Sequence, residues 1–394
     1  MKSYLLLSIG TAVVSLAVTS LAASTGPVFY GDAPDDHHPW AVHDRNRPQP
    51  KLVTPGTFSS QEQPGKPPSD ATILFDGTDL SKWLNSKDAP AEWLVKDGHM
   101  EVKPGTGEIH TKAQFGDLQL HIEWAAPTEI KGDSQGRGNS GVFLPGGVEI
   151  QVLDCYNNPS YADGMAGGYY GVNPPMANAV RPPGQYQAYD IVFRKPVYRD
   201  GKVLDPGYVT VFVNGVLTQD HTPLEGSTGH MGRTKPGPFP ERASLRLQDH
   251  GNPMRFRNIW CRELPPRTVE GGTDGYLTTE ATMAKRREIA TTIRADAAKL
   301  KNPAQPMPEL LRLAESLIYE TDPAALKQTE QMAAQYVASL KALPANQLAA
   351  KRDEARGLRD ALNYLARWKD IPADFAPKVA LDQLFKDQNW DKKR

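Results

Sequence analysis

The sequence has little that could support a metal centre, a disulfide framework or a charged interaction surface. Only two cysteines, Cys155 and Cys261, occur in 394 residues, so a thiolate zinc site is not expected, and the pair can be either bridged or free. The net charge is −1, which gives no electrostatic reason to expect nucleic acid or an anionic membrane as a partner. No metal and no cofactor are predicted, because no ligand spacing is found among seven of the nine histidines: His37, His38, His99, His110, His121, His221 and His230.

Long hydrophobic runs are also missing, except at the N-terminus. Residues 1–23 read as a signal peptide, with Lys2 as its charge, an apolar core from Leu5 to Val18 and small residues before a cleavage point after Ala23. An uncleaved membrane anchor is the alternative, although polar residues dilute the roughly 20 apolar residues that a span needs. We therefore expect an exported protein, periplasmic or extracellular, with no membrane span once the signal is removed.

Three further segments follow from composition. Residues 24–70 form a Pro-rich leader or linker, in which Trp40 is expected to dock on a folded body because an indole in a solvated tail is wasteful. Residues 71–264 carry short alternating runs with turns at Asp97-Gly98 and Asn214-Gly215, which are typical of β-hairpins. This pattern predicts a mainly β protein, an antiparallel β-sandwich or jelly roll.

A helical C-terminal extension is predicted over residues 265–394. Apolar residues recur there at helical spacing, and Asp322-Pro323 reads as an N-cap followed by proline at the first helical position. We expect three or four helices between about residues 279 and 368. The extension is either a module that binds the cell wall or a partner that the sequence does not identify, or an accessory helical hairpin that packs on itself or on the sandwich.

Glu149 and Gln151 mark the most informative stretch of the β region. They alternate with Val148, Ile150 and Val152, so in a strand both polar side chains project from one side. A Gly/Asn/Ser run with Asn139 and Ser140 precedes them, and a long Tyr-rich loop, residues 155–187, follows. Loops of this length are usually functional, and Tyr169 is one of the aromatic residues that could stack on a sugar ring. The stretch predicts one wall of a cleft that binds a polar ligand, most simply a sugar.

A second polar cluster lies near the end of the β region. His250 follows Gln248 at the end of an expected strand, and alternation places Arg255 and Arg257 on one face. A histidine can act as a general base near neutral pH, and an arginine can stabilise an oxyanion. The competing interpretation is a solvated hairpin turn with arginines in structural ion pairs.

Several motifs together resemble a known bacterial family. They are LFDGTDLSKW at residues 74–83, GNSGVF at 138–143, VEIQVLD at 148–154, VNG at 213–215, and LQDHG with RFRNI at 247–251 and 255–259. In this order they resemble the 3-keto-disaccharide hydrolases, also named 3-keto-glucoside-1,2-lyases/3-keto-2-hydroxy-glucal hydratases. The resemblance covers residues 71–264. It departs at Gln185-Tyr186-Gln187, where Glu-Trp-Asn is expected, so specificity there can differ.

The resemblance implies a concanavalin-like jelly roll that cleaves glycosides already oxidised at C3. The ketone acidifies the C2 proton, a base removes it, the enolate expels the glycosidic oxygen, and water can then add. His250 or Glu149 is the expected base, Arg255 or Arg257 the group that polarises the ketone, and Asp154 orients His250 or returns a proton. The expected ligands of the sugar hydroxyls are Asn139, Ser140, Gln151 and Gln248.

Three other functions fit parts of the sequence. A non-catalytic carbohydrate-binding sandwich is the main alternative, and a structural surface protein attached through its helical extension is another. A conventional endo-glycanase of the laminarinase type carries a Glu-x-Asp-x-(x)-Glu strand, but here Gln151 replaces the central acid and Asp154 the last. All of the site predictions assume that Glu149, His250 and the arginines converge on one pocket.

Overall fold

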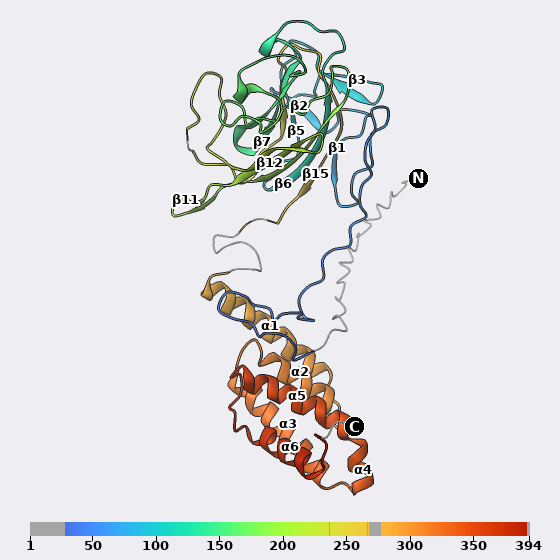
Figure 1. Cartoon of the computed structure of the whole chain (residues 1–394), viewed down its shortest axis with the longest axis vertical. Helices are drawn as coiled ribbons and strands as arrows, with labels where there is room; N and C mark the ends of the chain where they lie inside the picture. Colours follow the sequence, from blue (N-terminus) through green and yellow to red (C-terminus); the bar gives the residue numbers. More distant parts are fainter. Residues whose placement is uncertain (1–27, 236, 266, 268–276, 392–394) are drawn as a thin grey trace, which may run out of the picture. The chain divides into compact units, whose positions relative to one another are not determined.

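The computed structural model describes residues 28–235, 237–265, 267 and 277–391. It divides into a β unit, Leu52–Gly272, and a helical unit that combines Met1–Lys51 with Thr273–Arg394. Figure 1 colours the β unit mainly from blue to yellow and the helices from orange to red. The predicted signal peptide, residues 1–23, lies outside the described residues.

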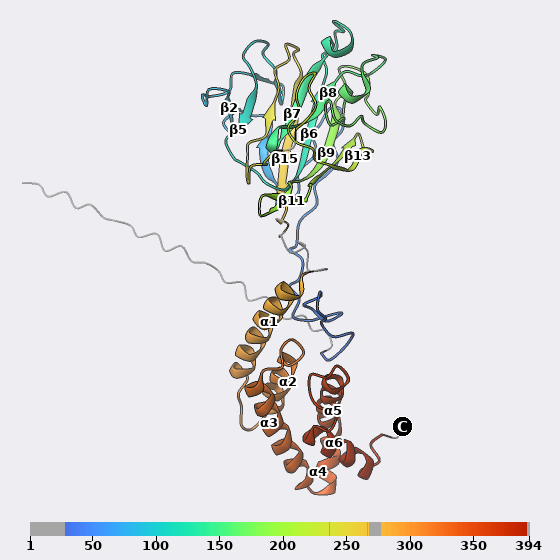
Figure 2. The same cartoon turned by 90° about the vertical axis from the view of Figure 1, so that its left-hand side faces the viewer.

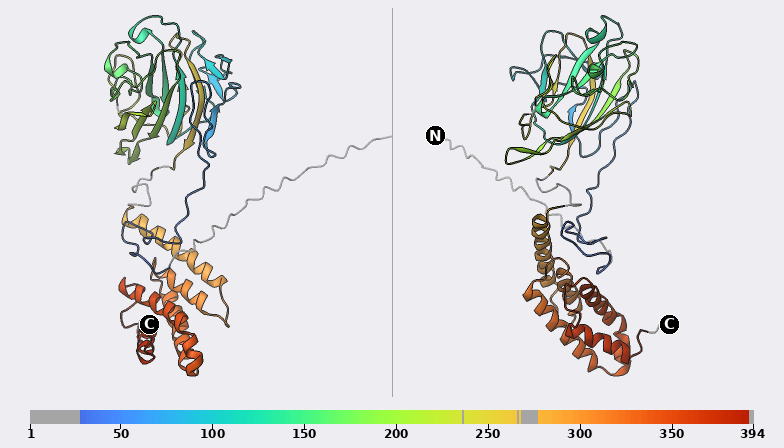
Figure 3. Two further views of the ribbon diagram at one scale, coloured as in Figure 1. Left: turned by 45° about the vertical axis from the view of Figure 1, so that its right-hand side comes forward. Right: turned by 60° about the vertical axis from the view of Figure 1, so that its left-hand side comes forward.

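The β unit consists of two antiparallel sheets and a small ribbon, as the views in Figures 2 and 3 show. The larger sheet has the order β13-β12-β9-β6-β15-β4-β3, with β1 also paired to β15; the smaller has the order β2-β5-β14-β7-β8; and β10 pairs with β11. The strands are β1 (Thr72–Phe75), β2 (Trp83–Asn85), β3 (Leu94–Lys96), β4 (His99–Glu101), β5 (Ile109–Thr111), β6 (Leu118–Ala125), β7 (Asn139–Leu144), β8 (Val148–Leu153), β9 (Gln187–Arg194), β10 (Val197–Arg199), β11 (Lys202–Asp205), β12 (Tyr208–Val213), β13 (Val216–Pro223), β14 (Arg246–Leu247) and β15 (Arg255–Glu263).

The predicted mainly β fold with helices at the C-terminal end is confirmed. Alternation along β6 sends Leu118, Leu120 and Ile122 into the core, where the inward-facing residues of the smaller sheet meet them. Both predicted hairpin turns form. Asp97 and Gly98 have φ values of 47° and 75°, the left-handed pair that a type I′ turn requires.

The long loop after β8 does not stay free of the sheet. Its residues 167–170 pair with the edge of β8, through the bonds from Gln151 N to Gly168 O and from Gly167 N to Gln151 O, both 3.0 Å. The loop therefore adds an edge to the smaller sheet and covers the backbone groups that β8 would otherwise expose. Cys155 and Cys261 are both buried and free.

The helical unit contains six α-helices in its described part, more than the three or four expected. They are α1 (Thr279–Lys299), α2 (Met307–Ser316), α3 (Pro323–Lys341), α4 (Ala345–Ala350), α5 (Arg352–Arg367) and α6 (Ala376–Asp387). The expectation failed because Pro344 and Lys351 bound an additional short helix, α4, between α3 and α5, and because α6 lies beyond residue 368. The N-cap prediction is correct, since the Asp322 side chain accepts a hydrogen bond from Ala325 N at 2.8 Å. None of the described helices is long and apolar enough to cross a bilayer.

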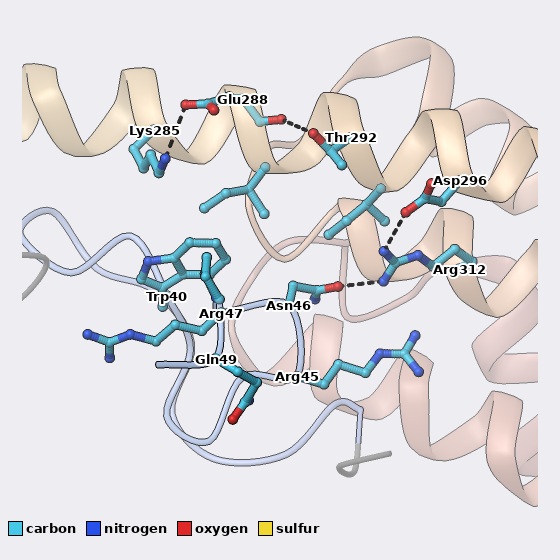
Figure 4. Close-up of a pocket in the computed structure, with 13 residues that line it drawn as sticks. Trp40, Arg45, Asn46, Arg47, Gln49, Lys285, Glu288, Thr292, Asp296 and Arg312 are labelled. Atoms are coloured by element: carbon cyan, nitrogen blue, oxygen red, sulfur yellow. Dashed lines mark hydrogen bonds and ion pairs between the residues drawn. The ribbon is translucent and has the colours of Figure 1, made fainter. Parts of the chain in front are cut away.

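Part of the leader packs on these helices, as predicted for Trp40. The indole is 9% exposed and meets Tyr319 edge to face, with a distance of 6.4 Å between ring centroids. Figure 4 shows Trp40 and Asn46 beneath α1, where Arg312 of α2 donates to Asn46 at 2.7 Å and to Asp296 at 3.1 Å. This stretch of the leader is thus a component of the helical core.

Candidate functional site

Glu149 and Gln151 project from the outer face of the smaller sheet, which we call the Glu149 face. In β8 the alternate residues Val148, Ile150 and Val152 are fully buried in the core between the sheets. The period of two therefore turns Glu149 and Gln151 outward, as the sequence predicted. β7 pairs with β8 so that Phe143 lies opposite Glu149 and Gly141 opposite Gln151.

Gly141 makes room for the Glu149 carboxyl group. A Cβ atom at position 141 would lie 2.3 Å from Glu149 Oε1, closer than any such contact allows. The carboxyl group thus lies flat against the backbone of β7 instead of extending into solvent. A larger residue at position 141 would displace the carboxyl group from the face.

The Glu149 carboxyl group is suited to exchanging protons near neutral pH. Burial raises the pKa of Glu149 to about 7, and the charge of Arg246 and a hydrogen bond from Thr228 oppose this only in part. Arg246, Phe143 and Glu149 form a row across β14, β7 and β8. The Arg246 guanidinium lies 4.3 Å from the centre of the Phe143 ring and pairs with Glu108 at 2.9 Å. The row places one cation two strands away from a carboxyl group that can act as base or acid.

A cluster of side-chain amides adjoins Glu149. Gln151 Nε2 donates to Gln135 Oε1 at 3.0 Å and to Asn139 Oδ1 at 3.2 Å, and Asn139 Nδ2 donates to Gln135 O at 2.8 Å. Gln151 is 1% exposed, yet its Oε1 has no hydrogen-bond partner among the described residues. A buried acceptor of this kind is costly unless a water or a ligand hydroxyl satisfies it.

The Tyr-rich loop contributes a cleft of about 330 Å³, which is lined by Tyr170, the residue that pairs with Glu149. Tyr170 N donates to Glu149 O at 3.1 Å, so Tyr170 lies directly across from Glu149 on the added edge of the sheet. The Tyr170 hydroxyl lies 2.8 Å from the Tyr161 hydroxyl and 3.0 Å from His230 Nδ1. The cleft is lined by Tyr161, Asp163, Tyr170, Gly171, Gly229, His230, Met231, Gly232 and Arg233.

Arg255 and Arg257 do not belong to this site, contrary to the sequence-based expectation. Phe256 between them is fully buried in the core, so both arginines point outward from the larger sheet. Arg257 donates to Glu123 at 2.8 Å, and Arg255 donates to Gly184 O at 3.3 Å. The expectation that β8 and β15 face each other across one hollow is wrong, because the two strands belong to different sheets whose outer faces point in opposite directions.

The predicted roles of His250 and Asp154 find no support in the geometry. His250 is exposed in the turn after β14, and the neighbouring Asp249 accepts from Gly105 N at 2.7 Å and Gly107 N at 3.0 Å, as in a structural turn. Asp154 is buried in an ion pair with Arg137, with a distance of 2.8 Å between Nε and Oδ2, instead of orienting His250. Gln248 continues the ladder, since its N donates to Gly141 O at 3.1 Å, and alternation places its side chain on the Glu149 face.

Two predicted substrate ligands lie inside the protein. Ser140 is 0% exposed and donates to Gln248 O at 2.7 Å, and Tyr169 is 0% exposed with its hydroxyl bonded to Gly226 O. Both share the inward side of their strands with core residues, so neither can reach a ligand. Alternation within the loop makes Tyr170, not Tyr169, the outward tyrosine. Sequence reasoning also missed Arg246, which the same alternation along β14 could have identified, and His230, for which the sequence gives no signal.

The outer face of the larger sheet, which we call the Glu123 face, holds a second network. His121 Nδ1 lies 2.7 Å from Asp190 and its Nε2 lies 3.3 Å from Glu123. Burial alone would lower the pKa of His121, but the hydrogen bonds and charges of these two carboxylates outweigh it and raise the pKa to about 9. Burial likewise opposes ionisation of Glu123, but hydrogen bonds with His121, Ser59 and Asn258 and the charge of Arg257 lower its pKa to about 2.

A segment of the leader covers this network. The leader hairpin, residues 57–66, is closed by the bond from Thr57 N to Lys66 O at 2.9 Å. Ser59 Oγ donates to Glu123, and Arg257 donates to Ser60 O and Gln61 O. A cleft of about 680 Å³ lies between the hairpin and the sheet, but four charged groups along it are already paired with one another: His121, Glu123, Asp190 and Arg257. Within the described ranges, no group of three or more His, Cys, Asp or Glu side chains could hold a metal ion.

The fold and the Glu149 face define a glycosyl hydrolase-like, carbohydrate-active β-sandwich. Residues 70–262 match the family model described as a 3-keto-alpha-glucoside-1,2-lyase-like domain. A solved structure described as a candidate glycosyl hydrolase from Parabacteroides distasonis ATCC 8503 is 46% identical, with a TM-score of 0.52 over 55% of this chain and 93% of that chain. The chain belongs to this family through its β unit.

Two more distant structures also match. A second candidate glycosyl hydrolase from Parabacteroides distasonis is 22% identical, with a TM-score of 0.35 over 50% of this chain and 94% of that chain. The carbohydrate-binding module CBM66 from Bacillus subtilis is 9% identical, with a TM-score of 0.26 over 46% of this chain and 96% of that chain. No curated protein matches the chain.

Proposed function

We propose that the β unit cleaves glycosides already oxidised to a ketone at C3, with Glu149 as the base that removes the C2 proton. The observation that carries this proposal is the buried Glu149 carboxyl group, whose pKa of about 7 matches general acid–base work at neutral pH. The family model, which is named for a 3-keto-glucoside lyase, supports the same reaction class. We further propose that the protein acts after export, as its N-terminal segment predicts.

The chemistry divides between Glu149 and its neighbours. The Glu149 carboxylate takes the proton from C2, the C–H electrons form the enolate, and the enolate expels the oxygen at C1. Arg246 takes the role that the sequence gave to Arg255 or Arg257, because it lies in the same row as Glu149 and can face the ketone oxygen as charge develops there. Gln151 Oε1 and Asn139 would accept from sugar hydroxyls. No second carboxylate acting as nucleophile is needed.

The test uses a 3-keto-glucoside in D₂O, with release of the aglycone and deuterium incorporation at C2 both followed by NMR. Glu149→Gln should lower both rates by about 10²–10⁴-fold, which is the usual contribution of a general base. The wild-type kcat/KM should rise with pH through about 7, because only the ionised carboxyl group accepts the proton. Glu129→Gln, at a carboxylate that is 74% exposed, is the matched control and should behave as wild type.

A non-catalytic carbohydrate-binding domain is the alternative. The amide cluster around Gln151 supports this alternative, because Gln151 Oε1 is a buried acceptor with no partner in the described part of the chain. Such an acceptor suits a bound sugar hydroxyl whether or not a reaction follows. It predicts saturable binding of the glycoside, with no aglycone released and no deuterium at C2. Absence of turnover by the wild type would reject the enzyme proposal, whereas full activity of Glu149→Gln would reject Glu149 as the base.

A further inference from the structure

Elimination from a 3-keto-glycoside needs a proton donor as well as a base, because the departing oxygen at C1 leaves as an alkoxide when nothing protonates it. An alkoxide is a poor leaving group, so a general acid that protonates the departing oxygen should raise the rate of elimination by about 10²–10⁴-fold. Glu149 cannot give this help in the elimination step, since it has just accepted the C2 proton. The donor must therefore be another side chain beside it.

A hydrogen-bonded chain of hydroxyl and imidazole groups lies beside Glu149. It runs from Tyr161 through Tyr170 to His230, with contacts of 2.8 and 3.0 Å. The loop that carries His230 also carries Thr228, whose N donates to Gly147 O at 3.0 Å, so this loop is fixed to the start of β8. The hydrogen-bonded side chains are thus held near Glu149 by two segments: the loop that carries Thr228 and His230, and the segment with Tyr170 that pairs with β8.

Of the two tyrosine hydroxyls in this hydrogen-bonded chain, that of Tyr161 is free to meet a ligand. The Tyr170 hydroxyl already contacts two groups, whereas the Tyr161 hydroxyl has one hydrogen-bond contact among the described residues, with Tyr170. Tyr161 is 43% exposed in the cleft, and its ring rests on Gly164, where an added Cβ atom would lie 2.0 Å from the ring. Burial, its hydrogen bond with Tyr170 and the charges nearby, including that of Glu149, raise the pKa of Tyr161, so the phenol stays protonated at neutral pH.

We propose that Tyr161 is the general acid that protonates the departing oxygen, with Tyr170 and His230 as positioning residues; this rests on the proposed function. In the elimination step the C2–H bond breaks and its proton passes to Glu149, the C1–C2 double bond forms, and the C1–O bond breaks as the Tyr161 proton passes to the leaving oxygen. In the hydration step the Tyr161 phenolate takes a proton from the water that attacks C1, and Glu149 returns its proton to C2. Both residues end as they began.

The test compares two 3-keto-glucosides that differ only in their leaving group. Methanol is a poor leaving group that needs a proton, whereas nitrophenol leaves without one. Tyr161→Phe should lose about 10²-fold or more in kcat on the methyl glucoside and stay within about threefold of wild type on the nitrophenyl glucoside. Tyr156→Phe, at an exposed tyrosine of the same loop, is the matched control.

Deuterium exchange at C2 tests the general-acid role of Tyr161 separately from the proposed function, in which Glu149 is the base. Tyr161→Phe should still exchange the C2 proton, because Glu149 is intact, whereas Glu149→Gln should not. Equal losses on both glucosides, or no loss on either, would overturn the role of Tyr161 while leaving that of Glu149 in place. Loss of C2 exchange in Tyr161→Phe would also overturn it, since the tyrosine would then act in an earlier step. A wild-type protein that neither exchanges C2 nor releases either aglycone would reject the proposed function itself.

Discussion

The two outer faces of the sandwich each present a buried glutamate, yet the two carboxyl groups have opposite properties. Glu149 on the smaller sheet is 5% exposed and Glu123 on the larger sheet is 2% exposed. Burial raises the pKa of Glu149 to about 7, whereas hydrogen bonds with its neighbours and the charge of Arg257 overcome burial and lower the pKa of Glu123 to about 2. Burial alone therefore does not decide the role of a carboxyl group; its partners do.

The comparison separates a structural carboxylate from a chemical one. Glu123 has every charge around it paired, and the leader hairpin covers it through Ser59. Such a group keeps its negative charge at any physiological pH and has no proton to exchange. Among the residues that the structure describes, the cation in the row of Glu149 lies at its far end, and the neighbouring amide oxygen of Gln151 has no hydrogen-bond partner. Reaction chemistry is expected where interactions are left incomplete.

The sharpest way to break the comparison is to neutralise each carboxyl group in turn. Glu123→Gln should lower the free energy of unfolding by about 3–5 kcal/mol, because it leaves Arg257 buried without its counter-charge. Glu149→Gln should cost less than about 1 kcal/mol at pH 7, because glutamine removes a charge that burial already disfavours. Urea unfolding of both variants measures the difference, and equal losses would show that the two faces are alike.

The pH dependence of stability should show the two faces in separate windows. The raised pKa of Glu149 contributes stability that is present below about 4.5 and is lost as the pH rises through about 7. The raised pKa of His121 contributes stability that is present below 6.5 and is lost as the pH rises through about 9. Each group accounts for at most about 3.4 kcal/mol, because the pKa moves from 4.5 to about 7 for Glu149 and from 6.5 to about 9 for His121.

Two variants test whether Glu149 and His121 cause the decline in stability in these two pH ranges. Glu149→Gln should flatten the decline between pH 4.5 and 7, and His121→Gln should flatten the decline between pH 6.5 and 9, as measured by chemical unfolding at several pH values. The lowered pKa of Glu123 adds a third window, because its stabilisation is lost as the pH falls from about 4.5 through 2. Unchanged profiles in both variants would contradict the assigned electrostatics.

The smallest expected effect concerns the leader hairpin. Ser59→Ala removes the hydroxyl that donates to Glu123 and should cost about 1.5–3 kcal/mol in unfolding free energy, the usual contribution of a hydrogen bond to a charged group. Ser60→Ala is its neighbour-matched control, since the Ser60 hydroxyl bonds only exposed groups of the hairpin, and it should cost less than about 0.5 kcal/mol. A similar cost for both would mean that the hairpin does not depend on Glu123.

The sequence was a good guide wherever a local rule governs the structure. The turn at Asp97-Gly98, the cap at Asp322 and the outward alternation of Glu149 and Gln151 depend on neighbours within a few residues. Each of them was predicted and found. The docking of Trp40 also followed from local reasoning, because a large apolar ring in a polar segment has to be buried somewhere.

The sequence misled where the answer depended on which sheet a strand joins. Arg257 and Glu149 both alternate with core residues, and the period of two is the same in either sheet, so nothing local shows that their outward directions oppose each other. Tyr169 and Tyr170 are adjacent in the sequence, and only the pairing of the loop with β8 decides which of the two side chains points outward.

By itself the sequence determined the β-sandwich, the helical extension, the family and the strand that carries Glu149, because these follow from periodicity, turn chemistry and motif order along the chain. Only the tertiary structure decided which residues surround that carboxyl group. Arg246, Tyr161 and His230 come from distant segments, and the pairing of strands within one sheet, together with the loop that joins its edge, brings them to one face.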